Sequence, residues 1–161
     1  MELTKIAFGG GCHWCTEAVF QSLKGVKNVA QGFIASKNKN ATFSEAVIVA
    51  FDAAKIDLKI LIEIHLLTHK STSKHSFRNK YRSAIYFFNT NQQKKVIQIL
   101  DELQSNFNEK IITKIIELKK FKPSSEQFQN YYQKNPNKPF CEKYIHPKLA
   151  LLTREFSKNL K

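Results

Sequence analysis

The chain passes from an apolar segment into a helical pattern through the run Ile6-Ala7-Phe8-Gly9-Gly10-Gly11-Cys12-His13-Trp14-Cys15. The weak alternation of residues 3–8 predicts a strand, and the three glycines that follow predict a tight turn. Apolar residues then recur at helical spacing over residues 14–23, which predicts a helix that ends before Gly25. Cys12 is therefore expected where a glycine turn leads from a strand into a helix.

The rest of the chain alternates between strand and helix patterns in the order β-α-β-β-α-β-α-β. This order predicts an α+β domain, a two-layer sandwich with a ferredoxin-like (split βαβ) core and helices packed on a mixed sheet. The length fits one domain over residues 1–161, with residues 134–161 as a C-terminal tail. Residues 111–118 fit either a strand or the end of the helix before them. The expected strands cover residues 3–8, 26–35, 46–51, 84–88 and 111–118, and the expected helices cover residues 14–23, 57–67, 91–105, 124–133 and 147–160.

The chain is strongly basic, with 26 Lys and Arg against 13 Asp and Glu and a formal net charge of +13. Basic residues are densest over residues 70–82, and no acidic residue occurs in residues 64–100. A solvated basic face is the simplest explanation, and contact with an anionic ligand is the alternative. The sequence contains no recognised nucleic-acid-binding motif, so no nucleic-acid partner is expected.

Apolar runs and cysteine usage indicate the compartment. No apolar run approaches the roughly 20 residues that span a bilayer, and the first residues lack the pattern of a secretion signal. We therefore expect a cytoplasmic monomer with no membrane contact and no cofactor. Three cysteines in such a chain indicate reactive or metal-binding thiols rather than a disulfide framework.

Cys12 is the strongest candidate for a chemical role. A cysteine is a useful nucleophile only as a thiolate, and the free N–H groups and partial positive charge of a helix N-terminus stabilise that form. The preceding glycines allow a substrate to approach the backbone closely. Cys15 follows on the same helical face, and Trp14 between them is suited to form a hydrophobic wall.

A metal site is the alternative interpretation of the same cysteines. Cys12 and Cys15 have the spacing of a zinc-binding pair, and Cys141 and His146 would complete a Cys3His set. The glycine-rich setting between strand and helix favours a catalytic thiol over such a zinc-held binding module. No metal is therefore assigned.

The run around Cys12 resembles the signature of the peptide methionine sulfoxide reductase A family. That signature is Gly-Cys-Phe-Trp, followed by Cys or another small residue and then an acidic position. The resemblance covers nearly the whole chain, and its most specific parts are the cysteine turn and the Tyr-Arg-Ser-Ala-Ile-Tyr run. The other agreeing stretches, in chain order, are Gly32-Phe33, Glu45-Ala46-Val47, Phe51-Asp52, residues 80–86, residues 129–136, Pro139-Phe140-Cys141 and Pro147-Lys148-Leu149.

The resemblance implies reduction of the S-epimer of methionine sulfoxide, free or in proteins, to methionine. It assigns Cys12 as the nucleophile, Glu45 as the acid, Tyr81 as a hydrogen-bond donor to the sulfoxide oxygen, and Trp14 as the wall for the substrate methyl group. The resulting sulfenic acid condenses with a second cysteine to a disulfide, which thioredoxin reduces. The favoured resolving cysteine is Cys141, in a tail that we expect to be mobile, and the alternative is Cys15.

The sequence departs from the family pattern at four places. His13 stands where the family has Phe, and Phe33 where it has Tyr. Ser76 takes the position of an Asp and Arg78 that of a Gly, within the basic segment, and residues 42–44 replace Gly-His-Ala in a shortened loop. These changes keep open a related thiol oxidoreductase that acts on another oxidised substrate. The expected substrate-binding residues are His13, Trp14, Phe33 and Ser76.

Overall fold

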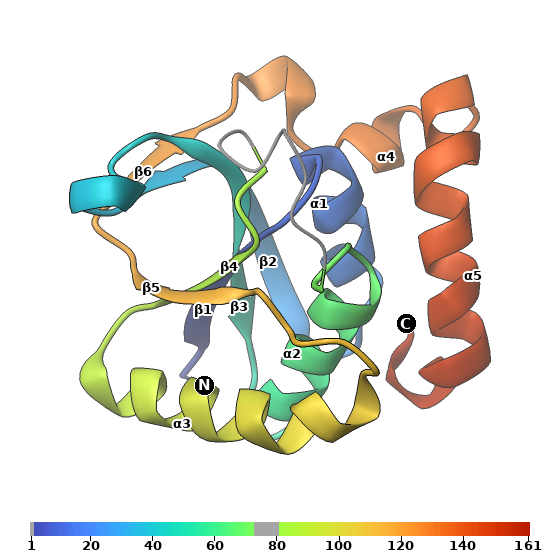
Figure 1. The fold of residues 1–161 in the computed structure, drawn as a ribbon. Coiled ribbons are helices and arrows are strands. Elements are labelled where there is room, and N and C mark those ends of the chain that lie inside the picture. Colours follow the sequence, from blue (N-terminus) through green and yellow to red (C-terminus); the bar gives the residue numbers. More distant parts are fainter. Residues whose placement is uncertain (1, 73–80) are drawn as a thin grey trace.

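A computed structural model describes residues 2–72 and 81–161 of the chain. Its centre is a six-stranded mixed sheet in the order β5-β4-β1-β3-β2-β6 (Figure 1). The strands are β1 (Thr4–Gly9), β2 (Val26–Ala35), β3 (Ser44–Phe51), β4 (Ala84–Phe87), β5 (Lys114–Glu117) and β6 (Lys120–Pro123). The α-helices are α1 (His13–Gln21), α2 (Leu58–Leu67), α3 (Thr90–Leu103), α4 (Tyr131–Lys134) and α5 (His146–Glu155).

The four central strands confirm the predicted split βαβ core. β1 lies between β3 and β4 and is antiparallel to both, while β2 pairs antiparallel with β3. Helices α1 and α2 make the two connections of this β-α-β-β-α-β unit. Beyond it, α3 connects β4 to its parallel neighbour β5, which is the crossover that a parallel pair requires.

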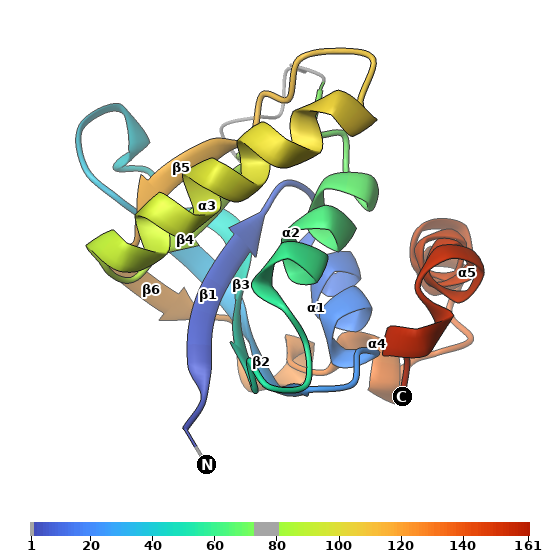
Figure 2. The same cartoon turned by 90° about the horizontal axis from the view of Figure 1, so that it is seen from below.

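Helices α1, α2 and α3 share one apolar core with one face of the sheet (Figure 2), and Leu152 of α5 belongs to the same cluster. Alternate residues of β1 point to this face, so Ile6 and Phe8 are fully buried, and Phe8 stacks on Phe20 of α1 with ring centroids 4.7 Å apart. Val96 of α3 and the apolar side chains of α2 belong to the same cluster. No helix in residues 2–72 or 81–161 is long and apolar enough to cross a membrane.

The C-terminal segment, which the sequence predicts as a tail, packs against the domain. A π-helical turn (Cys141–Ile145) leads into α5, which lies on the outer side of α1 (Figure 1). Cys141, Ile145 and Leu152 are fully buried. The chain end is also held, because the N–H of Lys161 donates to the carbonyl of Ser22 at 3.0 Å.

Between β5 and α4 the structure contains one strand that was not predicted and lacks one helix that was. Strand β6 was not predicted, and it extends the sheet by pairing antiparallel with β2. Residues 124–133 do not form one helix, because a 3-10 turn (Glu126–Phe128) ends at Gln129, whose backbone is extended, and Asn130 has a left-handed backbone (φ 57°) before α4. Tertiary hydrogen bonds fix this break, since the side chain of Gln129 bonds both the N–H and the carbonyl of Gln31.

Candidate active site

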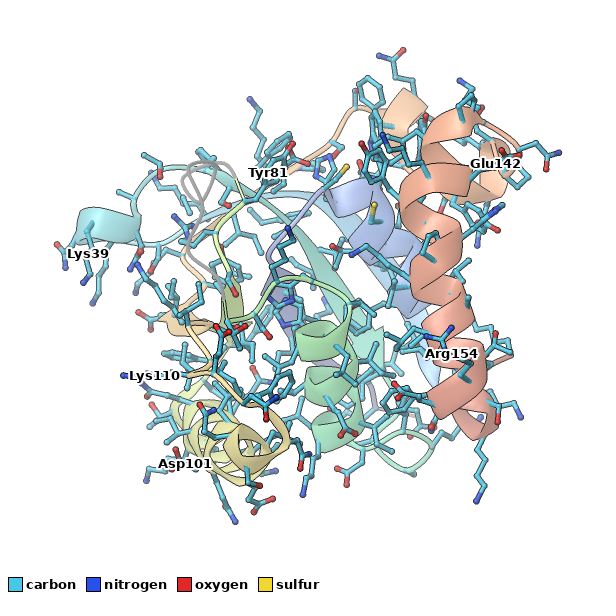
Figure 3. The ribbon with its side chains drawn as sticks, turned by 45° about the vertical axis from the view of Figure 1, so that its right-hand side comes forward. Lys39, Tyr81, Asp101, Lys110, Glu142 and Arg154 are labelled. Carbon is cyan, nitrogen blue, oxygen red and sulfur yellow. The ribbon has the colours of Figure 1, made fainter. Side chains whose placement is uncertain are left out.

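The sheet register brings the predicted site residues to one end of the molecule. Gly9, the last residue of β1, lies opposite Ala46 near the start of β3 and opposite Ala84 at the start of β4. The register of β2 against β3 places Phe33 opposite Glu45. Tyr81 comes just before β4, and Figure 3 shows it at the end of the molecule where α1 begins.

The glycine turn after β1 is fitted against two histidines of α2 and its following loop. Nε2 of His65 bonds the carbonyl of Gly9 at 2.7 Å. His69 lies against Gly10, where a Cβ atom would stand 2.4 Å from the imidazole. The His69 ring is held in turn by the carbonyl of His65 and by Oγ of Ser83. Neither histidine could be assigned to this turn from the sequence, because no local pattern links α2 to a turn more than fifty residues earlier.

Cys12 occupies the N-cap position of α1, as predicted. The largest influence on its acidity is a hydrogen bond from the thiol of Cys15, which lowers the pKa of Cys12 below its ordinary value. Backbone N–H groups of Trp14 and Cys15 act in the same direction, while burial and the charge of Glu45 oppose them. The net direction favours the thiolate, the nucleophilic form of cysteine.

Glu45 and His13 meet directly beside Cys12. The backbone N–H of His13 donates to Oε1 of Glu45 at 3.2 Å, and Nε2 of the same histidine lies 3.5 Å from that oxygen. Nδ1 of His13 bonds the carbonyl of Gly32 at 2.9 Å, and the ring contacts Phe33 edge-on with centroids 5.1 Å apart. Both side chains of the pair are buried. His13 is thus a polar partner of Glu45, at a position expected only to line the pocket.

Trp14 belongs to an aromatic wall next to the two N-terminal cysteines. Its indole stacks on Tyr131 of α4, with ring centroids 4.0 Å apart and an interplanar angle of 8°. Phe140 meets the same indole edge-on at 5.3 Å, and Phe128 lies 5.6 Å away. The sequence analysis predicted Trp14 as a wall but did not assign Tyr131 or Phe140 to the site.

Cys15 and Cys141 lie in one buried cluster with Ala18 and Ile145, and Cys12 packs against it. The thiol of Cys141 donates to the carbonyl of Asn135 at 3.1 Å, and burial raises the pKa of Cys141. The pKa of Cys15 is also raised, first because its thiol donates to Cys12 and then because it is buried. Of the three cysteines, Cys12 alone has a lowered pKa, which favours its thiolate. The raised pKa values of Cys15 and Cys141 favour their thiol forms.

Comparison with known proteins identifies this arrangement. The family model for peptide methionine sulfoxide reductase matches residues 4–160. The chain belongs to the peptide methionine sulfoxide reductase family. It is 35% identical to a peptide methionine sulfoxide reductase MsrA from Trichodesmium erythraeum and 32% identical to one from Acinetobacter baumannii, each match covering 96% of both chains.

The fold is also similar to a solved structure of the same kind. The reduced form of Mxr1 from Saccharomyces cerevisiae superposes with a TM-score of 0.76, covering 89% of this chain and 91% of Mxr1. The sequence identity over that match is 22%, so this likeness supports the fold. It confirms the predicted α+β architecture.

Within this family member, Arg82 links the start of β3, which carries Glu45, to the residues just before β4, where Tyr81 lies. Its buried guanidinium donates to the carbonyls of Ile34 and Thr42 at 3.1 and 3.2 Å, and its backbone N–H donates to Oγ of Ser44 at 2.8 Å. The residues that replace Gly-His-Ala before Glu45 are therefore tied to the Tyr-Arg-Ser run. The pattern of any one sequence segment could not predict this link, because its hydrogen bonds join residues at three different strands.

Two remaining sequence hypotheses concern Ser76 and zinc. Ser76 and Arg78 lie outside the described residues. In residues 2–72 and 81–161 no group of three His, Cys, Asp or Glu side chains is arranged to hold a metal ion. His146 instead meets the ring of Tyr132 edge-on, with centroids 5.6 Å apart. The Cys3His hypothesis, which needs Cys12, Cys15, Cys141 and His146 together, gains no support.

Proposed function

We propose that this chain reduces the S-epimer of methionine sulfoxide, free or in proteins, to methionine through Cys12. The observation that carries the proposal is the thiol at the start of α1. Its pKa is lowered by the Cys15 hydrogen bond, and it stands beside a buried carboxyl group, Glu45. Membership of the peptide methionine sulfoxide reductase family supports the same reaction.

The reaction breaks the sulfur–oxygen bond of the substrate and forms a sulfur–oxygen bond at Cys12. The thiolate of Cys12 attacks the sulfoxide sulfur while one proton passes to the sulfoxide oxygen. The sulfur–oxygen bond of the substrate then breaks, the hydroxyl group passes to Cys12, and methionine leaves. The substrate sulfur gains two electrons, and Cys12 loses two and becomes a sulfenic acid.

Named side chains take the supporting roles in this step. Glu45 supplies the proton, and Tyr81 donates a hydrogen bond to the sulfoxide oxygen. Trp14 packs against the substrate methyl group, with the aromatic wall of Tyr131 and Phe140 behind it. Phe33 and His13, whose rings contact each other, are further substrate-binding residues. Ser76 has this role from its position in the family pattern alone.

A second thiol attacks the sulfur of the sulfenic acid, and water leaves. Thioredoxin then reduces the disulfide that has formed. Cys141 is the thiol favoured by the family pattern, and it lies in the same cluster as Cys15. Cys15 has the support of its direct hydrogen bond to Cys12. We also propose that the chain works as a cytoplasmic monomer, where thioredoxin is available.

The decisive experiment is turnover of methionine S-sulfoxide with dithiothreitol, with the R-epimer as the stereochemical control. We expect methionine from the S-epimer only, background rates for Cys12→Ser, and a loss of about 10²-fold or more for Glu45→Gln. No turnover of either epimer, with Cys12 still rapidly alkylated, would instead indicate a thiol oxidoreductase with another oxidised substrate. Undiminished turnover in Cys12→Ser would refute the proposal.

The resolving thiol is identified by peptide mapping after one turnover without reductant. A Cys12–Cys141 disulfide in the wild type assigns Cys141, and a Cys12–Cys15 disulfide assigns Cys15. Cys15→Ser and Cys141→Ser serve as matched variants. The variant that lacks the resolving thiol retains one turnover per molecule and loses multiple turnovers with thioredoxin.

A further inference from the structure

The orientation of the His13 ring is fixed by a backbone group. A carbonyl oxygen only accepts hydrogen bonds, so the 2.9 Å contact with the carbonyl of Gly32 requires a hydrogen on Nδ1 of His13. The other ring nitrogen, Nε2, then faces Oε1 of Glu45 at 3.5 Å. The two side chains are only 8% and 9% exposed, so little water screens them from each other.

This contact favours one more proton than an imidazole protonated on Nδ1 and an ionised carboxylate hold between them. A neutral imidazole with its hydrogen on Nδ1 and an ionised carboxylate would present two lone pairs to each other in a buried site. A single proton on either atom replaces that repulsion with attraction. The pair is therefore either an imidazolium beside a carboxylate or an imidazole beside a carboxylic acid, and both forms hold the same proton.

We propose that His13 is the proton-holding partner of Glu45, and that together they form a two-residue acid for the sulfoxide oxygen. This deepens the proposed function and rests on it. As Cys12 attacks the sulfoxide sulfur, the shared proton passes through Glu45 to the sulfoxide oxygen. The pair is left as carboxylate and neutral imidazole, and a proton from solvent restores it before the next turnover. His13 is a positioning residue in this scheme, because it acts through Glu45.

The charges that the neighbouring elements bring toward the pair are consistent with this assignment. Cys12 precedes His13 on the chain, and the negative charge of Glu45 raises the pKa of Cys12. A proton held on the pair cancels that charge and so favours the thiolate. From the start of β4, the Arg82 guanidinium is directed to the carbonyls of Ile34 and Thr42.

Among residues 2–72 and 81–161, the ionisable groups named next come from the other elements around the pair. Glu17, one turn further along α1, accepts hydrogen bonds from the backbone N–H groups of Asn130 and Tyr131. Lys122 lies opposite Phe33 in the strand register and is exposed. Tyr81 has the assigned role of donor to the sulfoxide oxygen.

The proposal sets the direction of the pH dependence. Imidazole is the more basic of the two groups. The shared proton has two positions in the wild-type pair, on Nε2 of His13 or on the carboxylate, and only the carboxylate in a variant without the imidazole. Removal of the imidazole therefore moves the basic limb of the rate profile to lower pH. The acidic limb, set by Cys12 ionisation, has no reason to move in that direction.

The test compares His13→Phe and His13→Gln with the wild type in single-turnover formation of methionine across pH. We expect the basic limb to move down by about 1 to 2 pH units in both variants. His146→Gln is the matched control, since that ring contacts Tyr132 and not Glu45, and its profile should stay in place. Iodoacetamide alkylation of Cys12 at each pH separates thiol ionisation from proton supply. A lower rate at every pH, with both limbs unmoved, would mean that His13 is only a packing residue.

A spectroscopic measurement tests the pair without turnover. In NMR titrations the His13 ring, identified by its absence in His13→Phe, should lose its proton at lower pH in Glu45→Gln than in the wild type. An unchanged titration would overturn the proposal even if every variant remains folded. A wild-type protein that reduces no methionine sulfoxide would instead overturn the proposed function, while the titration would still report whether the pair exists.

Discussion

Gly10 and Gly11 are chemically identical neighbours with different surroundings in the turn before Cys12. Gly10 has φ +156°, and a Cβ atom on it would lie 2.4 Å from the His69 ring, which hydrogen bonds hold in place. A Cβ atom on Gly11 would meet nothing within 4 Å, and its backbone is ordinary. The two positions therefore form a matched pair for testing how the turn positions the nucleophile.

We expect Gly10→Ala to destabilise the fold by roughly 1–3 kcal/mol, because the methyl group must displace His69 or the turn. Gly11→Ala should stay within about 0.5 kcal/mol of the wild type. Urea unfolding followed by the fluorescence of Trp14, the one tryptophan of the chain, measures both. Equal stabilities for the two variants would show that the His69 contact does not constrain the turn.

Residue types and short spacing were enough to single out Cys12 as the candidate nucleophile, but they did not reveal the residues that surround it. Cys12, Cys15 and Trp14 lie within one helical turn, so their proximity follows from local geometry. His13 bonds Gly32 and Glu45, which come from two other strands, and His69 reaches the turn from the loop after α2. Such contacts depend on strand register. Hydrophobic alternation shows which face of a strand is buried, but not which residue of the neighbouring strand lies opposite each position.

Glu17 connects α1 with the segment that carries Tyr131. The side chain is fully buried, and its carboxylate accepts from the side chain of Gln31 at 3.0 Å and from the N–H groups of Asn130 and Tyr131 at 2.9 and 3.0 Å. Burial raises the pKa of Glu17, against the effect of these hydrogen bonds. The carboxylate thereby fixes the left-handed turn that places Tyr131 on Trp14.

Glu17→Gln should loosen this connection. The new amide nitrogen cannot accept a hydrogen bond, so at least one backbone N–H loses its partner at a cost of roughly 1–3 kcal/mol. Urea unfolding gives the loss of stability, and a change in Trp14 fluorescence reports the altered Tyr131 stack. The exposed Glu142→Gln is the matched control and should change neither. Unchanged stability and fluorescence in Glu17→Gln would contradict this role.

The same segment explains where the prediction of secondary structure failed. Residues 124–133 have an amphipathic pattern, but Asn130 takes a left-handed conformation held by Glu17, and Gln129 bonds to β2 instead of continuing a helix. Strand β6 has only four residues and pairs with β2, which lies far from it in the sequence. Strands β1 to β4 and helices α1 to α3 were found because each carries its own apolar period.

The net charge of +13 is a property of the whole molecule, and its electrostatic field acts on charged substrates. Close to the site, a cavity of about 430 Å³ runs beside Gly10 and Gly11, with Lys70 and Lys148 in its lining. A field of this sign favours the approach of acidic peptides. It is screened as salt rises, because the Debye length falls from about 10 Å at 0.1 M to about 3 Å at 1 M.

We therefore expect kcat/KM for an acidic methionine sulfoxide peptide to exceed that for a basic one at low salt, and the two values to converge toward 1 M salt. Free methionine sulfoxide, which has no net charge, should change little. Lys70→Glu and Lys158→Glu each lower the net charge by two, but Lys158 lies near the opposite end of α1 from Cys12. If the lining of the cavity guides the peptide, Lys70→Glu reduces the preference for the acidic substrate more strongly. Equal reductions would assign the effect to net charge, and equal turnover of both peptides by the wild type would contradict steering altogether.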